Sequence, residues 1–240
     1  MPLIATGIYK QLIAKKQSAL GTKATAGSAQ TYRRVTSSLD LAKATYKSGE
    51  IRTSQQRSDF RHGVRSVAGA ISGELSPGTY QGFIESVCRA LASTAITTGA
   101  IVTVTAAVTS GAAGTFTRSS GSFITDGFLI GHVVNWSGWA TTGVPNNAHN
   151  FLITALSATV MTGIMLDGVA IGAKAAGDSV TGVTTKFVKV PLTGHTRDYW
   201  TIEHNFADIV QSEQFKDCVF KSMNVKLPAT GMATVDFNVM

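Results

Sequence analysis

Residues 66–86 read SVAGAISGELSPGTYQGFIES, and the spacing of the apolar residues changes at Pro77. Before Pro77, one face of an extended chain holds Val67, Ile71 and Leu75, and the other holds Ser, Ala and Glu. After it, the apolar residues recur at a spacing near 3.6, at Tyr80, Phe83, Ile84 and Val87. The sequence therefore predicts a strand over about Val64–Leu75 and a helix over about Pro77–Leu91, with Ser76 as its cap.

The composition of the whole chain favours sheets. Only 15% of the 240 residues are charged, 24 are Gly, and Ser and Thr are abundant. From about Thr115 to Lys186, short apolar runs alternate with turn signals, which predicts a small β module inserted between other strands. The C-terminal runs on either side of PATGM predict a hairpin.

These patterns predict an organisation in three parts. Residues 1–114 are expected to hold an N-terminal arm, strands, a long loop and the helix, residues 115–186 the inserted module, and residues 187–240 the last strands. Ile4, Ile8 and Leu12 share one helical face, so the N-terminal segment is expected to be a docking arm. Trp136 and Trp139 are expected to pack in the module, and Cys88 and Cys218 are not expected to form a disulfide.

Positive charge is concentrated at one end. Residues 1–65 hold twelve Lys or Arg and three acids, whereas the whole chain holds 21 basic and 14 acidic residues. Such a segment fits nucleic acid, an anionic membrane or a partner subunit. The uncharged run from Ala90 to Thr117 is rich in Thr, Ser and Gly, so we interpret it as strand and loop and expect no membrane insertion.

No motif points to catalysis. The chain lacks GxxxxGK[ST], GxGxxG after a strand, GxSxG and HExxH, and its five histidines have no metal-ligand spacing. Glu203 and His204 are neighbours in a predicted strand, so their side chains point to opposite faces. We therefore expect no catalytic, cofactor-binding or metal-binding residues and no enzyme activity.

The segment Glu50–Arg89, with a polar loop, a Gly-containing strand and an ELSPGTY helix start, resembles the tail tube proteins of tailed bacteriophages. The segment Phe128–Gly138 and the terminal hairpin are similar to the same family. The resemblance implies a mainly β protein, with a β-sandwich or barrel and one flanking helix. It also implies hexameric rings that stack into a tube in the virion tail.

Further expectations follow from that resemblance. The protein would be made in the bacterial host cytoplasm and would assemble with itself, a tape-measure protein and a tail terminator. DNA would pass through the lumen without specific binding. The small Ser and Ala face of the opening strand could supply the lumen wall.

The loop from about Lys43 to Gly63 is too long for a connector and carries many charges, so we expect it at the contact between stacked rings. The candidate contact residues are Lys47, Glu50, Arg52, Arg57, Asp59 and Arg61.

Other functions remain open at this point. The tube protein of a related bacterial injection machine would share the fold, and a nucleic-acid-binding module would use the basic first third. An outer-membrane barrel would need regular lipid-facing strands, and the pattern lacks them.

Overall fold

The computed structural model describes residues 7–25, 27–50, 53 and 59–240, and the chain divides into two compact units. The first unit comprises Met1–Leu91 with Val188–Met240, and the second comprises Ala92–Phe187. Each unit has its own core of buried apolar side chains. The units are therefore described separately.

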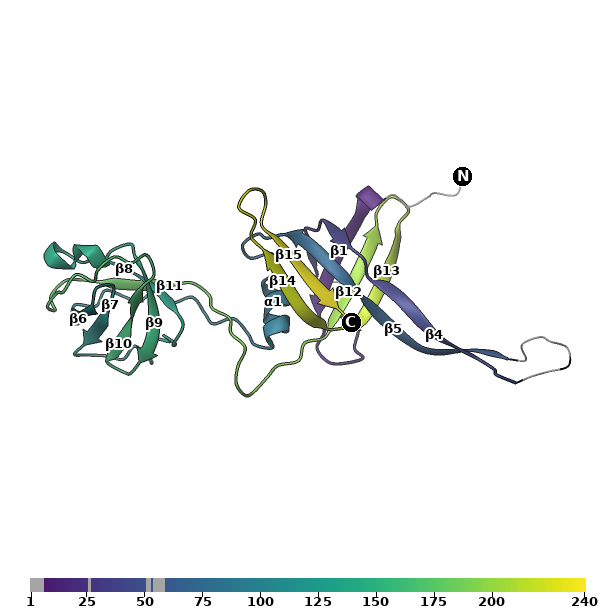
Figure 1. The fold of residues 1–240 in the computed structure, drawn as a ribbon, viewed down its shortest axis with the longest axis horizontal. Helices are drawn as coiled ribbons and strands as arrows, with labels where there is room; N and C mark the ends of the chain where they lie inside the picture. The colour runs from purple at the N-terminus through teal and green to yellow at the C-terminus, as the bar shows by residue number, and fades with distance from the viewer. Residues whose placement is uncertain (1–6, 26, 51–52, 54–58) are drawn as a thin grey trace. The chain divides into compact units, whose positions relative to one another are not determined.

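The first unit is a β-sandwich of two antiparallel sheets (Figure 1). Sheet A has the order β13-β12-β1-β2, and sheet B has the order β14-β15-β5-β3, with β4 also pairing with β5. The strands of sheet A are β1 (Lys10–Lys16), β2 (Gln30–Tyr32), β12 (Trp200–Phe206) and β13 (Gln211–Cys218). The strands of sheet B are β3 (Thr36–Ser37), β4 (Asp40–Lys47), β5 (Phe60–Glu74), β14 (Phe220–Lys226) and β15 (Thr234–Val239). The predicted mainly β fold and the predicted terminal hairpin, β14–β15, are confirmed.

The alternating residues before Pro77 do form a strand, which is the second half of β5. In β5 the side chain of Ile71 and the backbone of Gly73 are buried, whereas Glu74 is exposed. The strand is longer than expected, beginning at Phe60, because its first half pairs with β4. The expected loop from Lys43 to Gly63 is therefore wrong at both ends, where the chain forms paired strands.

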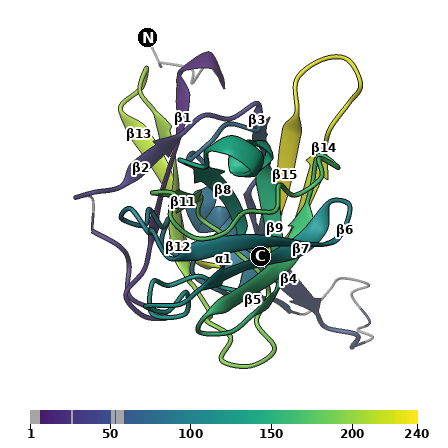
Figure 2. The same ribbon diagram turned by 90° about the vertical axis from the view of Figure 1, so that its left-hand side faces the viewer.

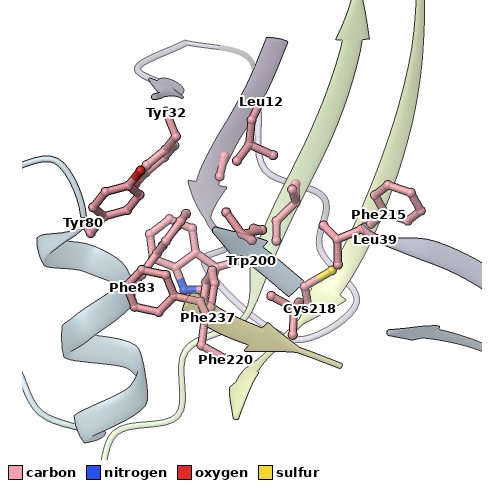
Figure 3. Packing of buried hydrophobic residues seen from close by; sticks show 14 of the residues in the cluster. Leu12, Tyr32, Leu39, Tyr80, Phe83, Trp200, Phe215, Cys218, Phe220 and Phe237 are labelled. Atoms are coloured by element: carbon pink, nitrogen blue, oxygen red, sulfur yellow. The ribbon is translucent and has the colours of Figure 1, made fainter. Parts of the chain in front are cut away.

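The helix that follows, α1, is shorter than expected and spans Gln81–Cys88. The Ser76 hydroxyl does not cap it, because that oxygen lies 2.6 Å from the Thr79 hydroxyl in a turn before the helix. The helix ends where Arg89 takes a left-handed φ of 53°. Figure 3 shows the helix directing Tyr80 and Phe83 toward the aromatic core of the sandwich.

Phe83 is the centre of that core. Its side chain is fully buried, and its ring stacks on Tyr32 at 4.3 Å and on Phe220 at 4.1 Å between centroids. These two partners belong to sheet A and sheet B, so the helix ties the two sheets together. A polar contact fixes the back of the helix, where the Trp200 indole donates a hydrogen bond of 2.9 Å to Ser86.

The helical face expected for the N-terminal docking arm is wrong for the described residues Ile8 and Leu12. Residues Gly7–Tyr9 form one 3-10 turn (η1), and the chain then enters β1, which pairs with β12 along its whole length. Leu12 and Ala14 alternate into the core, whereas Ile8 is 87% exposed. Ile4 lies outside the described residues. The apolar spacing was compatible with a helix, but pairing with a strand about two hundred residues along decides the outcome.

The second unit is a small, curved antiparallel sheet (Figures 1 and 2). Its order is β11-β8-β9-β10-β7-β6. Its elements are β6 (Val104–Ser110), β7 (Ala113–Arg118), β8 (Val133–Ser137), η2 (Thr141–Asn146), β9 (Asn150–Leu156), β10 (Val160–Met165) and β11 (Thr181–Thr184). Bridges Thr97↔Val183, Ile101↔Val180 and Ala106↔Lys174 join its two ends, so the sheet closes toward a barrel.

The extent of this unit differs from the expected module, 115–186. Strand β6, which was assigned to the tube core, pairs with β7 and contributes Val104 to the unit's buried cluster. The unit therefore begins at Ala92. Trp136 and Trp139 are buried in its core, as predicted.

Candidate assembly surface

The strand edges of the first unit are its most prominent exposed feature. Sheet B ends at β14, with seven residues, on one side and at the two-residue strand β3 on the other. Strand β4, with eight residues, pairs with the first half of β5 beyond β3. Sheet A ends in β13 with eight residues and β2 with three. Long unpaired edges expose backbone donors and acceptors that can pair with another chain.

Strands β4 and β5 also form an arm, defined here as Asp40–Lys47 paired with Phe60–Ala68. Figure 1 shows the arm extending away from the sandwich. Every residue of β4 is exposed, and large apolar side chains are exposed along the arm. These side chains are Leu41, Tyr46, Phe60 and Val64. A two-stranded ribbon is at best marginally stable in water, so the arm is suited to being covered by a partner.

Four of the candidate contact residues, Lys47, Glu50, Asp59 and Arg61, are described, and they lie toward the far end of this arm. Lys47 ends β4 opposite Phe60, and Arg61 is paired with Asp59 through an Nε–Oδ2 distance of 2.6 Å. Glu50 is exposed three residues beyond Lys47. Arg52 and Arg57 lie outside the described residues. The structure thus places Lys47, Asp59 and Arg61 close together in the fold, and their role in ring stacking stays a prediction.

Sequence reasoning missed the basic residues nearer the root of the arm. Lys43 and Arg65 are directly opposed in the β4–β5 ladder. Like charges directly opposed in a ladder destabilise it, which again favours an arm that is completed by a partner. The alternation in DLAKATYK could have indicated a strand here, but its apolar residues are too few to make the pattern clear.

The face of sheet B that points away from the core is small and polar. On β5 it carries Ser66, Ala68, Ala70, Ser72 and Glu74, and the opposed positions of β15 and β14 carry Thr234, Asp236, Asn238, Ser222, Asn224 and Lys226. Tyr80 packs on the core-facing side of sheet B, because a Cβ added at Gly73 would overlap the hydroxyl of Tyr80. Helix α1 therefore leaves this face open.

The charges on this face largely neutralise one another. Lys226 Nζ lies 3.2 Å from Asp236 Oδ2. A hydrogen bond from the Ser72 hydroxyl, together with Lys226, lowers the pKa of Asp236, so that carboxylate is ionised at neutral pH. The result is a surface of short side chains with little net charge.

The sandwich is open on the side opposite the helix. A groove of about 590 Å³ lies between β13 and the root of the arm. Its lining mixes apolar and charged side chains from both sheets and the C-terminus, among them Leu41, Arg65, Val67, Lys216 and Met240. The groove gives the unit two unlike sides, one closed by α1 and one open.

Other kinds of site have less support. In the ranges that the structure describes, no group of three or more His, Cys, Asp or Glu could hold a metal ion. No helix of the described chain is long and apolar enough to cross a membrane. Cys88 and Cys218 are both free thiols.

Comparison with known proteins agrees with the features of this surface. A family model described as phage tail tube protein matches residues 10–240, which include both units and the arm. No curated protein matches the chain.

Proposed function

This chain belongs to the phage tail tube protein family, and on that premise we propose that six copies form a ring and that stacked rings form the conduit for DNA ejection. Membership of the family supports a structural role and a place in the virion tail.

The observation that carries the proposal is the length of the family match, which leaves out only the first nine residues. The exposed arm and the exposed edges of β14 and β4 support it, because a monomer gains nothing from such edges. A closed ring pairs every edge and so removes the risk of uncontrolled aggregation.

We further propose that DNA passes through the ring without specific binding. The small, nearly neutral outer face of sheet B supports this part, because it offers no cluster of Lys or Arg to hold phosphates. The protein would act without catalysis, would be made in the bacterial host cytoplasm, and would meet a tape-measure protein and a tail terminator.

We propose that Lys47, Glu50, Arg52, Arg57, Asp59 and Arg61 make the contact between stacked rings. The exposure of Arg61 and Asp59, which are paired within one chain, supports this proposal. An exposed ion pair between two rings would contribute at most about 1 kcal/mol, but ring symmetry would repeat it around the tube.

Electron microscopy of the purified, concentrated chain tests the proposal. We expect hollow rings or tubes with sixfold symmetry. A protein that stays monomeric over a wide range of concentration and salt would contradict it. Tight, steeply salt-dependent binding to duplex DNA would instead favour a nucleic-acid-binding module.

A further inference from the structure

We infer that His132 is a latch that fastens the two ends of the second unit to each other, and that protonation of its ring opens this latch. The latch is defined here as the side chains of His132 and Ser93 with the backbone of Phe187. It lies where the chain enters the unit at Ala92 and leaves it at Phe187. The latch belongs to the second unit by itself, so it does not depend on ring formation.

Hydrogen bonds tie the two ends of the unit together. The backbone N–H of Ser93 donates to the carbonyl of Phe187 over 2.8 Å, and the backbone N–H of Phe187 donates to the Ser93 hydroxyl oxygen over 3.0 Å. The same hydroxyl oxygen lies 3.1 Å from Nε2 of His132. A single serine side chain therefore connects both ends of the unit to the histidine.

The ring of His132 is buried beneath the end of the unit. His132 is 1% exposed, and the ring of Phe187 meets it edge to face at 5.6 Å between centroids. Phe187 also lies against Gly131, where a Cβ would come within 2.8 Å of the phenyl ring. Gly131 has a φ of 95°, so both the turn and the close approach of Phe187 require glycine at this position. The last residue of the unit is thus packed on the turn that carries His132.

The hydrogen bonds of the ring require its neutral form. The backbone N–H of Leu129 donates to Nδ1 of His132 over 3.3 Å, so Nδ1 carries no proton. In the neutral ring the proton is then on Nε2, which donates to the Ser93 hydroxyl. A second proton would have to enter at Nδ1, where it would face the Leu129 N–H. Protonation therefore replaces a hydrogen bond with two opposed donors and places a charge in a buried site.

The charged groups around the latch do not favour a protonated ring. Among the described segments that form the latch, the charged residues are Asp126, Lys186 and Lys189, and strand β9, which pairs with the backbone of His132, has none. The two lysines have the same sign as a protonated ring, and Asp126 is already paired with Arg118. Burial lowers the pKa of His132 below 6.5, so the latch is closed at neutral pH and its opening takes up one proton.

The opening has a defined extent. Next to the latch, the backbone N–H of Thr184 donates to the carbonyl of Ile96 over 2.8 Å, and the backbone N–H of Ile96 donates to the Thr184 hydroxyl over 3.1 Å. Release of the latch would therefore free residues 92–95 and 185–187 and stop at this pair. Each freed residue would lengthen a linker to the first unit by at most about 3.5 Å.

Hydrogen exchange of the full chain at a series of pH values tests the latch. Peptides that cover 92–95 and 185–187 report its opening, and peptides of β10 report the rest of the unit. After correction for the intrinsic pH dependence of exchange, protection of the two end segments should fall by up to about tenfold per pH unit below pH 6.5, until the pKa of the closed latch is passed. Protection of β10 should stay unchanged.

Three variants separate the latch from other effects. His132→Asn removes the titrating ring, so protection of the end segments should be low at every pH. Ser93→Ala is a smaller change that removes the hydroxyl joining the two ends, and it should lower their protection roughly tenfold at neutral pH. His149→Asn is the matched control, because His149 is a partly exposed histidine of the same unit that pairs with Asp167. It should keep the pH dependence of the wild type.

The outcomes decide the inference in either direction. A pH dependence of the end segments that disappears in His132→Asn and persists in His149→Asn supports the latch. The same dependence in His132→Asn would overturn it, because another group would then take up the proton. Equal protection at about pH 8 and about pH 5 in the wild type would also overturn it, as would an equal loss of protection in β10. If His132→Asn does not fold, Ser93→Ala decides, and wild-type protection of its end segments at neutral pH would refute the latch.

Discussion

At the scale of single residues, two glycines explain the apolar face of the opening strand. A Cβ at Gly69 would lie 2.6 Å from the carbonyl oxygen of Ser38, where the chain passes between β3 and β4. A Cβ at Gly73 would overlap the hydroxyl of Tyr80, which donates a hydrogen bond to the carbonyl of Arg33. The sequence predicted the alternation of this strand, but the neighbours that require glycine come from distant segments.

The first prediction concerns Gly73. Gly73→Ala should destabilise the protein by roughly 1–3 kcal/mol, because Tyr80 must move out of its buried position. Urea unfolding measures the change. Gly49→Ala is the matched control, since a Cβ there meets nothing within 4 Å. Equal stability of the two variants would show that Tyr80 is not held against β5.

The second prediction concerns Phe83. Phe83→Ala should cost about 3–5 kcal/mol, because it removes a fully buried ring that stacks on both sheets and leaves a cavity. Phe60→Ala, at a ring that is 54% exposed, should change stability far less. A melting curve of the Phe83 variant that matches the wild type would remove this residue from the core.

The third prediction concerns the buried His204. Burial, with the nearby Lys10 and Arg34, lowers its pKa from 6.5 to about 4. Its Nε2 lies 2.7 Å from the Ser37 hydroxyl, and its Nδ1 has no hydrogen-bond partner. Glu213 lies 3.8 Å from Nδ1 and would favour the charged ring, but its side chain is 64% exposed, so water screens it. Burial therefore decides the direction of the shift, and the pKa of His204 is lowered.

Between pH 6.5 and 4, the imidazole of His204 is protonated more readily in the unfolded chain than in the folded protein. The contribution of His204 to stability is thus complete above pH 6.5 and is lost as pH falls toward 4, by at most about 3 kcal/mol. Urea unfolding at a series of pH values measures this slope. His204→Gln should flatten it, and an unchanged slope in that variant would assign the effect to other groups.

At the scale of elements, prediction succeeded where one face of a strand is buried. The β14–β15 hairpin was evident because Val235 and Phe237 alternate into the core after a Pro-Gly turn. The arm was missed because β4 buries neither face, and a strand without a buried face leaves no alternation to detect. The candidate contact residues were found from charge alone, so their pairing across two strands could not be predicted.

The fourth prediction concerns the far end of the arm. Lys47→Glu with Arg61→Glu should leave the melting temperature of the monomer nearly unchanged, because both side chains are exposed. Long tubes should be lost, and high salt should weaken wild-type polymerisation in the same direction. Lys23→Glu with Lys189→Glu changes the net charge equally at exposed positions off the arm. Tubes of normal length from the Lys47 and Arg61 variant would move the stacking contact elsewhere.

At the scale of the whole molecule, the chain carries two independent cores. The cluster around Phe83 draws only on residues outside 92–187, and the cluster around Trp136 only on residues within that range. The sequence indicated an inserted module from its change in texture. The predicted start of the module, at residue 115, is too late. Residues 97–106 belong to this unit through bridges to residues 174–183, and such pairing between distant segments leaves no local pattern in the sequence.

The fifth prediction follows from this separation. Replacing residues 92–187 with a short Gly/Ser linker should leave the sandwich folded and still able to form rings, because no residue of its core is removed. Circular dichroism checks that the sandwich is folded, and electron microscopy checks that it forms rings. A shortened protein that is folded and soluble yet never assembles would show that the second unit takes part in the ring.

Strand β5 connects the exposed arm directly to the core of the sandwich. Its fifteen residues span roughly 50 Å at about 3.3 Å each. One end lies in the arm beside Lys47, and the other ends at Glu74, next to the glycine beneath Tyr80. The arm is thus the continuation of a core strand, and its ladder has one register shift between Lys43 and Thr45. A force applied to the arm would reach the packing of helix α1 along this single unbroken strand.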